Sequence, residues 1–288
     1  MTTARMPSGT FRKHAGAPTQ LVPRHSALVR LTHWINVFCF SLLLMTGAQI
    51  FNAHPRLYWG EYGADNDHAW LSVDSLQKGA SWRGVVHLGS LTFESTGLLG
   101  ASRENGNLSP RGFPAWLTIP SYQDLAAGRR WHFFFAWLFA INGALYLVGG
   151  LVKRHFRRDL LPTRAELAPA NLVHEVVDHA KLNFPKGEAA RRYNVLQKLT
   201  YMGVAFVLLP LMVLTGLTMS PGLDSAFHIL LDIFGGRPSA RSIHFICASL
   251  LVAFVVLHVV MVLVSGVWNN LRSMITGRYA IEIDGDKA

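Results

Sequence analysis

Charged residues are absent from four long stretches of this 288-residue chain, and that pattern decides the predicted fold class. The stretches without Asp, Glu, Lys or Arg are 31–55, 131–152, 199–223 and 242–271. Each reaches the roughly 20 residues with which an α-helix crosses the hydrocarbon of a bilayer. Backbone in lipid must satisfy its own hydrogen bonds, so the pattern predicts an all-α membrane protein, built as an antiparallel bundle of four transmembrane helices.

Long connections separate the predicted helices. We place the helices at about 27–52, 131–153, 193–220 and 240–270, joined by a long loop, 53–130, and a second loop, 154–192. A basic arm, 1–26, precedes this membrane domain, 27–279, and a short tail, 280–288, follows it. The arm has neither an apolar core nor a cleavage site, which indicates an uncleaved anchor. Apolar residues recur at helical spacing from Leu172 to Ala180, which predicts an amphipathic helix on the membrane surface.

Composition and charge indicate the orientation of the bundle. Half of the residues are hydrophobic and 15% are charged, as is typical of membrane proteins. Residues 1–30, 153–198 and 272–288 together hold 18 of the 27 Lys and Arg residues against 8 acids. Residues 56–130 and 224–241 hold 9 against 9. The positive-inside rule therefore predicts cytoplasmic termini and a periplasmic loop 53–130, in a bacterial inner membrane. The net charge of +10 follows from this topology, and no nucleic-acid partner is expected.

Four histidines fall within the predicted spans: His33, His132, His244 and His258. Polar residues at membrane depth are costly and mark function, although a single imidazole can also serve to bond a neighbouring helix. Fourteen residues of helix make about four turns and rise about 21 Å, so His244 and His258 face one side at opposite depths. Helix direction then pairs His258 with His33 near the cytoplasm and His244 with His132 near the outer surface. Two stacked imidazole pairs are the arrangement that two bis-histidine haems require.

An arginine precedes three of these histidines by three residues, at Arg30, Arg129 and Arg241. This position lies on the same helix face, one turn nearer to water. The guanidinium there either binds a haem propionate or anchors the helix end at the interface. Four glycines in the spans allow close approach of a porphyrin or ordinary helix packing. They are Gly47, Gly143, Gly149 and Gly216. The stretches LLLMTG at 42–47 and LMVLTG at 211–216 look alike but are too short to indicate duplication.

These motifs resemble the di-haem cytochrome b subunits of nickel-iron hydrogenases, formate dehydrogenases and thiosulfate-reductase-like complexes, a bacterial cytochrome b561-like family. The resemblance covers about 25–279 and depends on "HW" at 33–34, on "IH" and "LH" fourteen residues apart in the last helix, and on "YNVLQK" at 193–198. It implies that His33, His132, His244 and His258 are the axial ligands of two haem b groups. The long loop offers His87 as a substitute for His132.

The resemblance also implies a quinone site beside the cytoplasmic-side haem. Asn194 of the "YNVLQK" motif would contribute to it, with Gln197 and Lys198 as further candidates. The alternative is that Asn194 caps the third helix and Lys198 lies at the interface. The implied partners are the quinone pool and a periplasmic catalytic subunit, reached directly or through an electron-transfer subunit. The long loop favours a molybdopterin-type oxidoreductase over a hydrogenase, and the direction of electron flow stays open.

Three other functions compete with this interpretation. A free-standing cytochrome b561-type quinol:superoxide oxidoreductase would carry similar histidines, but such proteins are typically shorter and need no docking surface as large as 53–130. A non-haem metal-binding protein or transporter needs ligands clustered at one depth, often with carboxylates, and no Asp or Glu falls within the four charge-free stretches. A structural anchor would leave the four histidines unexplained.

Overall fold

The computed structural model describes residues 19–63, 67–104, 106–183, 193–220, 222–223 and 225–282. In this part of the chain, four helical segments are long and apolar enough to cross a membrane. They are α1 (Ala27–Asn52), α2 (Leu125–Val152), the segment Val195–Thr218 and α7 (Arg237–Val264). The predicted four-helix membrane bundle is therefore confirmed.

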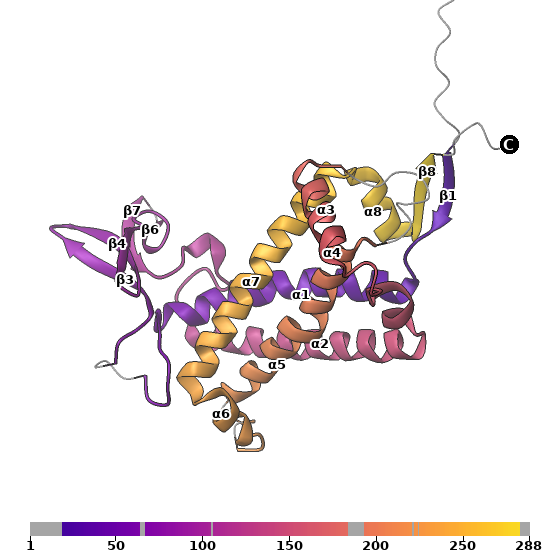
Figure 1. The fold of residues 1–288 in the computed structure, drawn as a ribbon. Helices are drawn as coiled ribbons and strands as arrows, with labels where there is room; N and C mark the ends of the chain where they lie inside the picture. Colours follow the sequence, from indigo (N-terminus) through magenta and orange to yellow (C-terminus); the bar gives the residue numbers. More distant parts are fainter. Residues whose placement is uncertain are drawn as a thin grey trace, which may run out of the picture.

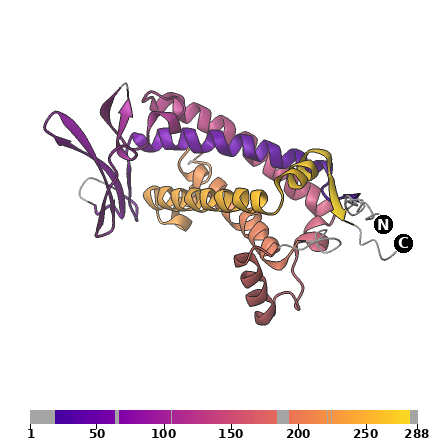
Figure 2. The same cartoon turned by 90° about the horizontal axis from the view of Figure 1, so that it is seen from above.

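The four spans form two antiparallel pairs. α1 packs along α2, and α5 (Leu209–Thr218) packs along α7, whereas the backbones of the two pairs approach each other much less closely. α7 crosses the α1–α2 pair obliquely (Figure 1). We call the end at Ala27, Val152 and Val264 the terminal end, because the described chain begins and ends there, and the opposite end the sheet end (Figure 2).

The third span is interrupted by a wider turn. It comprises α4 (Val195–Gly203), the π-helical segment η4 (Val204–Leu208) and α5. Pro210 lies just after the π turn and lacks the N–H that would bond to the carbonyl of Phe206, which accounts for an irregular turn at this point. The irregularity lies in the middle of the span and leaves α5 to pack against α7.

Two predicted helix boundaries differ from the observed ones. α2 begins at Leu125, where Asp124 caps it by accepting a hydrogen bond of 2.9 Å from the N–H of Ala127. The charges of Arg129 and Arg130 ended the apolar stretch but do not end the helix, so His132 lies two turns inside α2. The predicted last helix ends early, at Val264, and Gly266 with a φ of 109° starts a separate helix, α8 (Val267–Thr276).

Strands fill the segment that the sequence predicted as a loop. β2 (Arg56–Leu57), β3 (Leu71–Lys78), β4 (Ser81–Leu88) and β5 (Leu91–Glu94) form an antiparallel sheet in that order, and β6 (Gly100–Glu104) pairs with β7 (Asn107–Arg111). Two-residue turns beginning at Gly79 and Gly89, both with positive φ, connect the hairpins. From the sequence alone this segment is predicted only as a long loop, because a search for charge-free stretches of spanning length does not register strands of four to eight residues.

The strand-rich segment is fixed to the sheet end of the bundle. Phe51 at the end of α1 packs with Leu57 and Val73 of the sheet, and Phe245 of α7 packs against them. The indole N–H of Trp70 donates a hydrogen bond of 2.9 Å to the hydroxyl of Ser242 on α7. These contacts hold the segment beside the first turns of α7.

Smaller elements complete the fold. β1 (Thr19–Pro23) pairs antiparallel with β8 (Arg278–Glu282), which joins the two ends of the described chain in a ribbon that the sequence did not predict. The amphipathic helix predicted around Leu172–Ala180 is α3 (Pro169–Ala180). The remaining short helices are η1 (Ala115–Leu117), the π-helical η2 (Phe156–Leu160) and α6 (Ile229–Phe234).

Large apolar side chains cover the outside of the spans. On α2, Leu138, Ile141, Leu145 and Val148 are exposed and recur every three or four residues, so they form one continuous face. Apolar patches of this extent are rare on soluble monomers. The face is therefore suited to contact with lipid.

Candidate functional site

His132 of α2 and His244 of α7 lie together toward the sheet end, with ring centroids 6.3 Å apart. Each imidazole has a threonine partner on the neighbouring helix. Nδ1 of His132 lies 3.0 Å from Oγ1 of Thr46 on α1, and Nδ1 of His244 lies 2.9 Å from Oγ1 of Thr215 on α5. We call His132 and His244 the sheet-end pair.

The threonine contacts fix which imidazole nitrogen carries the proton. The Thr46 hydroxyl donates to the carbonyl of Leu42 at 2.7 Å, and the Thr215 hydroxyl donates to that of Leu211 at 2.6 Å. A hydroxyl has one proton to donate, so each threonine oxygen accepts a hydrogen bond from Nδ1–H of its histidine. Nε2 of each ring is then unprotonated, and its lone pair is available for a metal ion.

His33 of α1 and His258 of α7 form a second pair toward the terminal end, with ring centroids 6.4 Å apart. Aromatic side chains flank this terminal-end pair. Phe254 stacks on His258 with centroids 5.7 Å apart, and Trp34 meets His33 edge-on at 5.3 Å. The indole N–H of Trp34 donates to the carbonyl of Met274 at 3.0 Å, so α8 covers this end of the site.

The spacing of both pairs fits a bis-histidine metal centre. A metal–imidazole bond is about 2 Å long, so two rings that coordinate one ion from opposite sides have centroids about 6 Å apart. Each pair also joins one helix of the α1–α2 pair to α7, across the region where the backbones are less closely packed. Within the described residues, no group of three or more His, Cys, Asp and Glu side chains forms an alternative metal site. The four histidines thus form two separate imidazole pairs rather than one cluster.

The three predicted propionate arginines all lie near the ends of the helices that carry these histidines. Arg30 donates to the carbonyl of Ile275 near the end of α8, yet its Nε is buried and has no hydrogen-bond partner in the described part of the chain. Arg241 donates to the carbonyl of His54. Arg129 lies 5.9 Å from the centroid of the Phe133 ring. The orphaned Nε of Arg30 favours an anionic group such as a propionate at the terminal-end pair.

Two of the four predicted glycines face the sheet-end pair. A Cβ on Gly47 would lie 3.4 Å from Cε1 of His132, and a Cβ on Gly216 would lie 3.6 Å from Cε1 of His244. Gly149 instead packs against Leu28, as expected for ordinary helix contact, and Gly143 has no neighbour within 4 Å of an added Cβ.

The predicted quinone residues have partners within the protein. Asn194 caps α4, and together with Gln197 it forms a reciprocal capping box with distances of 2.9 and 3.3 Å. Lys198 forms an ion pair with Glu166, with distances of 2.8 and 3.0 Å. The capping role that the sequence offered as the alternative is present in the structure. A quinone contact at these residues stays a prediction.

His87 does not approach the other histidines of the site. It lies on β4, where Nδ1 is 3.0 Å from the hydroxyl of Thr92 and Nε2 is 3.8 Å from Asp74. The structure thus brings His132, rather than His87, to His244.

Thr46 and Thr215 are site residues that the sequence analysis did not assign. Their signal was visible in the similar stretches at 42–47 and 211–216, which end in Thr46–Gly47 and Thr215–Gly216. Each threonine bonds one histidine of the sheet-end pair, and each glycine borders the same ring. The similarity therefore reflects equivalent positions beside the two rings.

Comparison with known proteins defines the class. The family model for prokaryotic cytochrome b561 matches residues 24–277 of the chain. The chain therefore belongs to the prokaryotic cytochrome b561 family, and haem b binding is implied by that membership. Among curated proteins, it is similar to a protein of Azospira oryzae provisionally named protein-methionine-sulfoxide reductase subunit YedZ1. The two are 26% identical over 256 residues, which cover 88% of this chain and 96% of the relative.

Proposed function

We propose that this protein is a membrane subunit that holds two haem b groups and connects the quinone pool to a periplasmic oxidoreductase. The observation that carries the proposal is the presence of two histidine pairs, with centroid separations of 6.4 and 6.3 Å, at opposite ends of one bundle. His33 and His258 would hold one haem, and His132 and His244 the other. Their one-electron chemistry would connect the two ends of the bundle.

The distribution of Lys and Arg supports the orientation. The terminal end carries most of the basic excess, so it would face the cytoplasm, and the strand-rich segment would face the periplasm. That segment is anchored beside the sheet-end pair by Phe51, Trp70 and Ser242, which suits it to dock a partner close to the electron exit. A folded segment of this size favours a docked subunit over a free-standing quinol:superoxide oxidoreductase.

The relative suggests the class of partner and the direction of flow. The relative is named as a subunit of a protein-methionine-sulfoxide reductase, an enzyme that consumes electrons. By analogy, electrons here would enter from quinol at the terminal end and leave at the sheet end for a periplasmic reductase. A molybdopterin-type enzyme remains our prediction for that partner, directly docked or reached through an electron-transfer subunit.

The test is anaerobic reduction of the purified haem-loaded protein by menadiol, a soluble quinol. We expect menadiol to reduce both haems of the wild type. In His258→Ala, dithionite should still reduce the remaining haem, but menadiol should not. In His244→Ala, menadiol should reduce the remaining haem at the wild-type rate. Rapid reduction of His258→Ala by menadiol would contradict quinol entry at the terminal end, and efficient reduction of the wild type by superoxide would favour the alternative oxidoreductase.

A further inference from the structure

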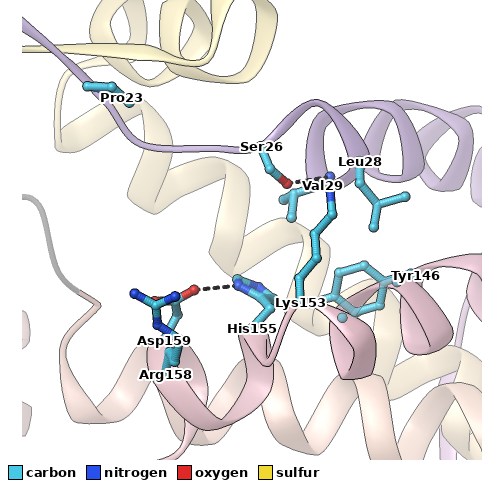
Figure 3. Close-up of a pocket in the computed structure, with 11 residues that line it drawn as sticks. Pro23, Ser26, Leu28, Val29, Tyr146, Lys153, His155, Arg158 and Asp159 are labelled. Carbon is cyan, nitrogen blue, oxygen red and sulfur yellow. Dashed lines mark hydrogen bonds and ion pairs between the residues drawn. The ribbon is translucent and has the colours of Figure 1, made fainter.

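A cavity of about 580 Å³ lies at the terminal end, between the start of α1 and the end of α2 (Figure 3). Leu28 and Val29 of α1 form an apolar wall. The polar lining comes from the last turns of α2 and from the residues that follow it: Tyr146, Lys153, His155, Arg158 and Asp159. Small-molecule sites have volumes of about 300–1,000 Å³ and combine apolar walls with a few polar groups. The cavity fits this description.

His155 and Asp159 form a pair that can accept and move a proton. Nδ1 of His155 lies 2.6 Å from Oδ2 of Asp159, as the dashed line in Figure 3 marks. A carboxylate can only accept, so Nδ1–H donates and Nε2 stays free to take a proton. The His155 side chain is 19% exposed and that of Asp159 is 51% exposed, so the pair connects the cavity to water. The ring of Tyr146 meets the His155 ring edge-on, with centroids 6.4 Å apart.

A second polar pair lies at the terminal end, just before α1 and α4. The hydroxyl of Tyr193 lies 3.3 Å from Nδ1 of His25. Burial lowers the pKa of His25 to about 4 and raises the pKa of Tyr193, so both groups are neutral at pH 7. They add a pair of neutral polar groups at the terminal end.

We propose that this cavity binds the head group of a quinol. His155, which is held by Asp159, takes up the proton of a quinol hydroxyl. The inference rests on the proposed function, because it needs an electron-transfer chain that begins at the terminal-end pair. Oxidation of one quinol breaks two O–H bonds and releases two protons and two electrons. Nε2 of His155 accepts the protons in turn and passes them to water along Asp159, while the two electrons leave through the chain of the proposed function.

Two other assignments compete with this one. The first places the head group at Asn194 and Lys198, but their side chains are engaged in the α4 cap and in the ion pair with Glu166. The second places a lipid phosphate in the cavity, held by Lys153 and Arg158. The apolar wall and the His155–Asp159 pair favour a neutral carbonyl compound that exchanges protons.

The test uses the full-length haem-loaded protein in nanodiscs. The binding probe is the fluorescent quinone analogue 2-heptyl-4-hydroxyquinoline N-oxide, and menadiol is the reductant. We expect His155→Gln to weaken probe binding at least tenfold and to slow menadiol-driven reduction at least tenfold. Asp159→Asn, which keeps the shape of the side chain, should slow reduction at least tenfold. Haem content and both midpoint potentials should stay at wild-type values in each variant.

A matched control is available on α3. His174 and Asp178 form a pair with the same four-residue spacing, with Nε2 of His174 3.2 Å from Oδ2 of Asp178, and neither lines the cavity. His174→Gln should therefore leave probe binding and reduction unchanged. An equal loss in this control would overturn the assignment to the cavity.

Three outcomes separate the competing assignments. In the first outcome, His155→Gln and Asp159→Asn bind the probe and are reduced by menadiol as the wild type is, whereas Lys198→Met loses both properties. This outcome would overturn the cavity assignment in favour of a site at the α4 cap. In the second outcome, phospholipid co-purifies with the wild type but not with Arg158→Met, and probe binding is the same in both. This outcome would assign the cavity to a lipid phosphate and would also overturn the proposal. Failure of menadiol to reduce the wild type would count against the proposed function, and probe binding that is lost in His155→Gln would then still support the cavity.

Discussion

Replacing Thr215 by valine should raise the midpoint potential of one haem and leave the other unchanged. Thr215 is fully buried, and its hydroxyl oxygen accepts from Nδ1–H of His244 at 2.9 Å. An acceptor at this position makes the imidazole more basic and stabilises ferric iron, so losing it favours the reduced form. A buried neutral hydrogen bond contributes about 1 kcal/mol. A tenfold change corresponds to about 59 mV for one electron and to about 1.4 kcal/mol. Only the difference in bond strength between the ferric and ferrous forms changes the potential, so we expect a rise of at most about 40 mV.

An anaerobic potentiometric titration of the reduced α-band measures this shift as one of two one-electron components. Thr46→Val should shift the same component, because Thr46 is the equivalent partner of His132 at 3.0 Å. Thr215→Ser keeps the hydroxyl and should restore the wild-type potential. Thr218→Val is the matched control, since Thr218 is equally buried on α5 but donates only to the carbonyl of Thr215. Equal shifts in Thr215→Val and Thr218→Val, or none in either, would refute the reasoning.

The remaining predictions concern haem content and stability. His258→Ala and His244→Ala should each retain about one haem per chain by the pyridine haemochrome assay, with different midpoint potentials, and identical spectra and potentials would contradict two distinct sites. His132→Ala should lose one haem and His87→Ala should keep both, since His87 is bonded to Thr92 on the sheet; the reverse result would transfer the ligand role to His87. Burial lowers the pKa of His25 to about 4 from an unfolded value of about 6.5, so its contribution to stability is present above pH 6.5 and is lost as the pH falls toward 4. The melting temperature of His25→Gln should therefore fall less over that interval than that of the wild type, and parallel curves would contradict this.

Hydrophobicity predicted the spans well because lipid imposes a simple rule on them. A charge-free stretch of spanning length has few alternatives to a helix, and the four candidate spans confirm that prediction. The early start of α2 was missed because Arg129 and Arg130 close the apolar window, although Asp124 provides the cap from which the helix begins. Charge marks the edge of the membrane, whereas capping marks the end of the helix.

The rule that predicts membrane-spanning helices from charge-free stretches does not apply to the strand-rich segment. Its strands are held by pairing between residues such as Ser72 and His87, and by contact with Phe51 on α1, which depend on tertiary structure rather than on local hydrophobicity. The turn glycines Gly79 and Gly89 were the local signal, because their positive φ suits two-residue hairpins.

The histidine pairs were predictable because helix direction and depth fix which side chains can meet. Their threonine partners were not assigned, because a threonine in an apolar helix usually bonds to its own backbone, as Thr46 and Thr215 also do. The cavity between α1 and α2 was likewise not predicted. It depends on the turn after Val152, where Arg154 has a φ of 53° and the π-helical η2 brings His155 and Asp159 together.

Haem stoichiometry tests the central claim most directly. The full-length protein, purified from a host supplied with haem, should contain two b-type haems per chain by pyridine haemochrome, because four imidazoles in two pairs about 6 Å apart make two bis-histidine sites. A folded preparation that is colourless, or that binds one haem with all four histidines intact, would contradict the account.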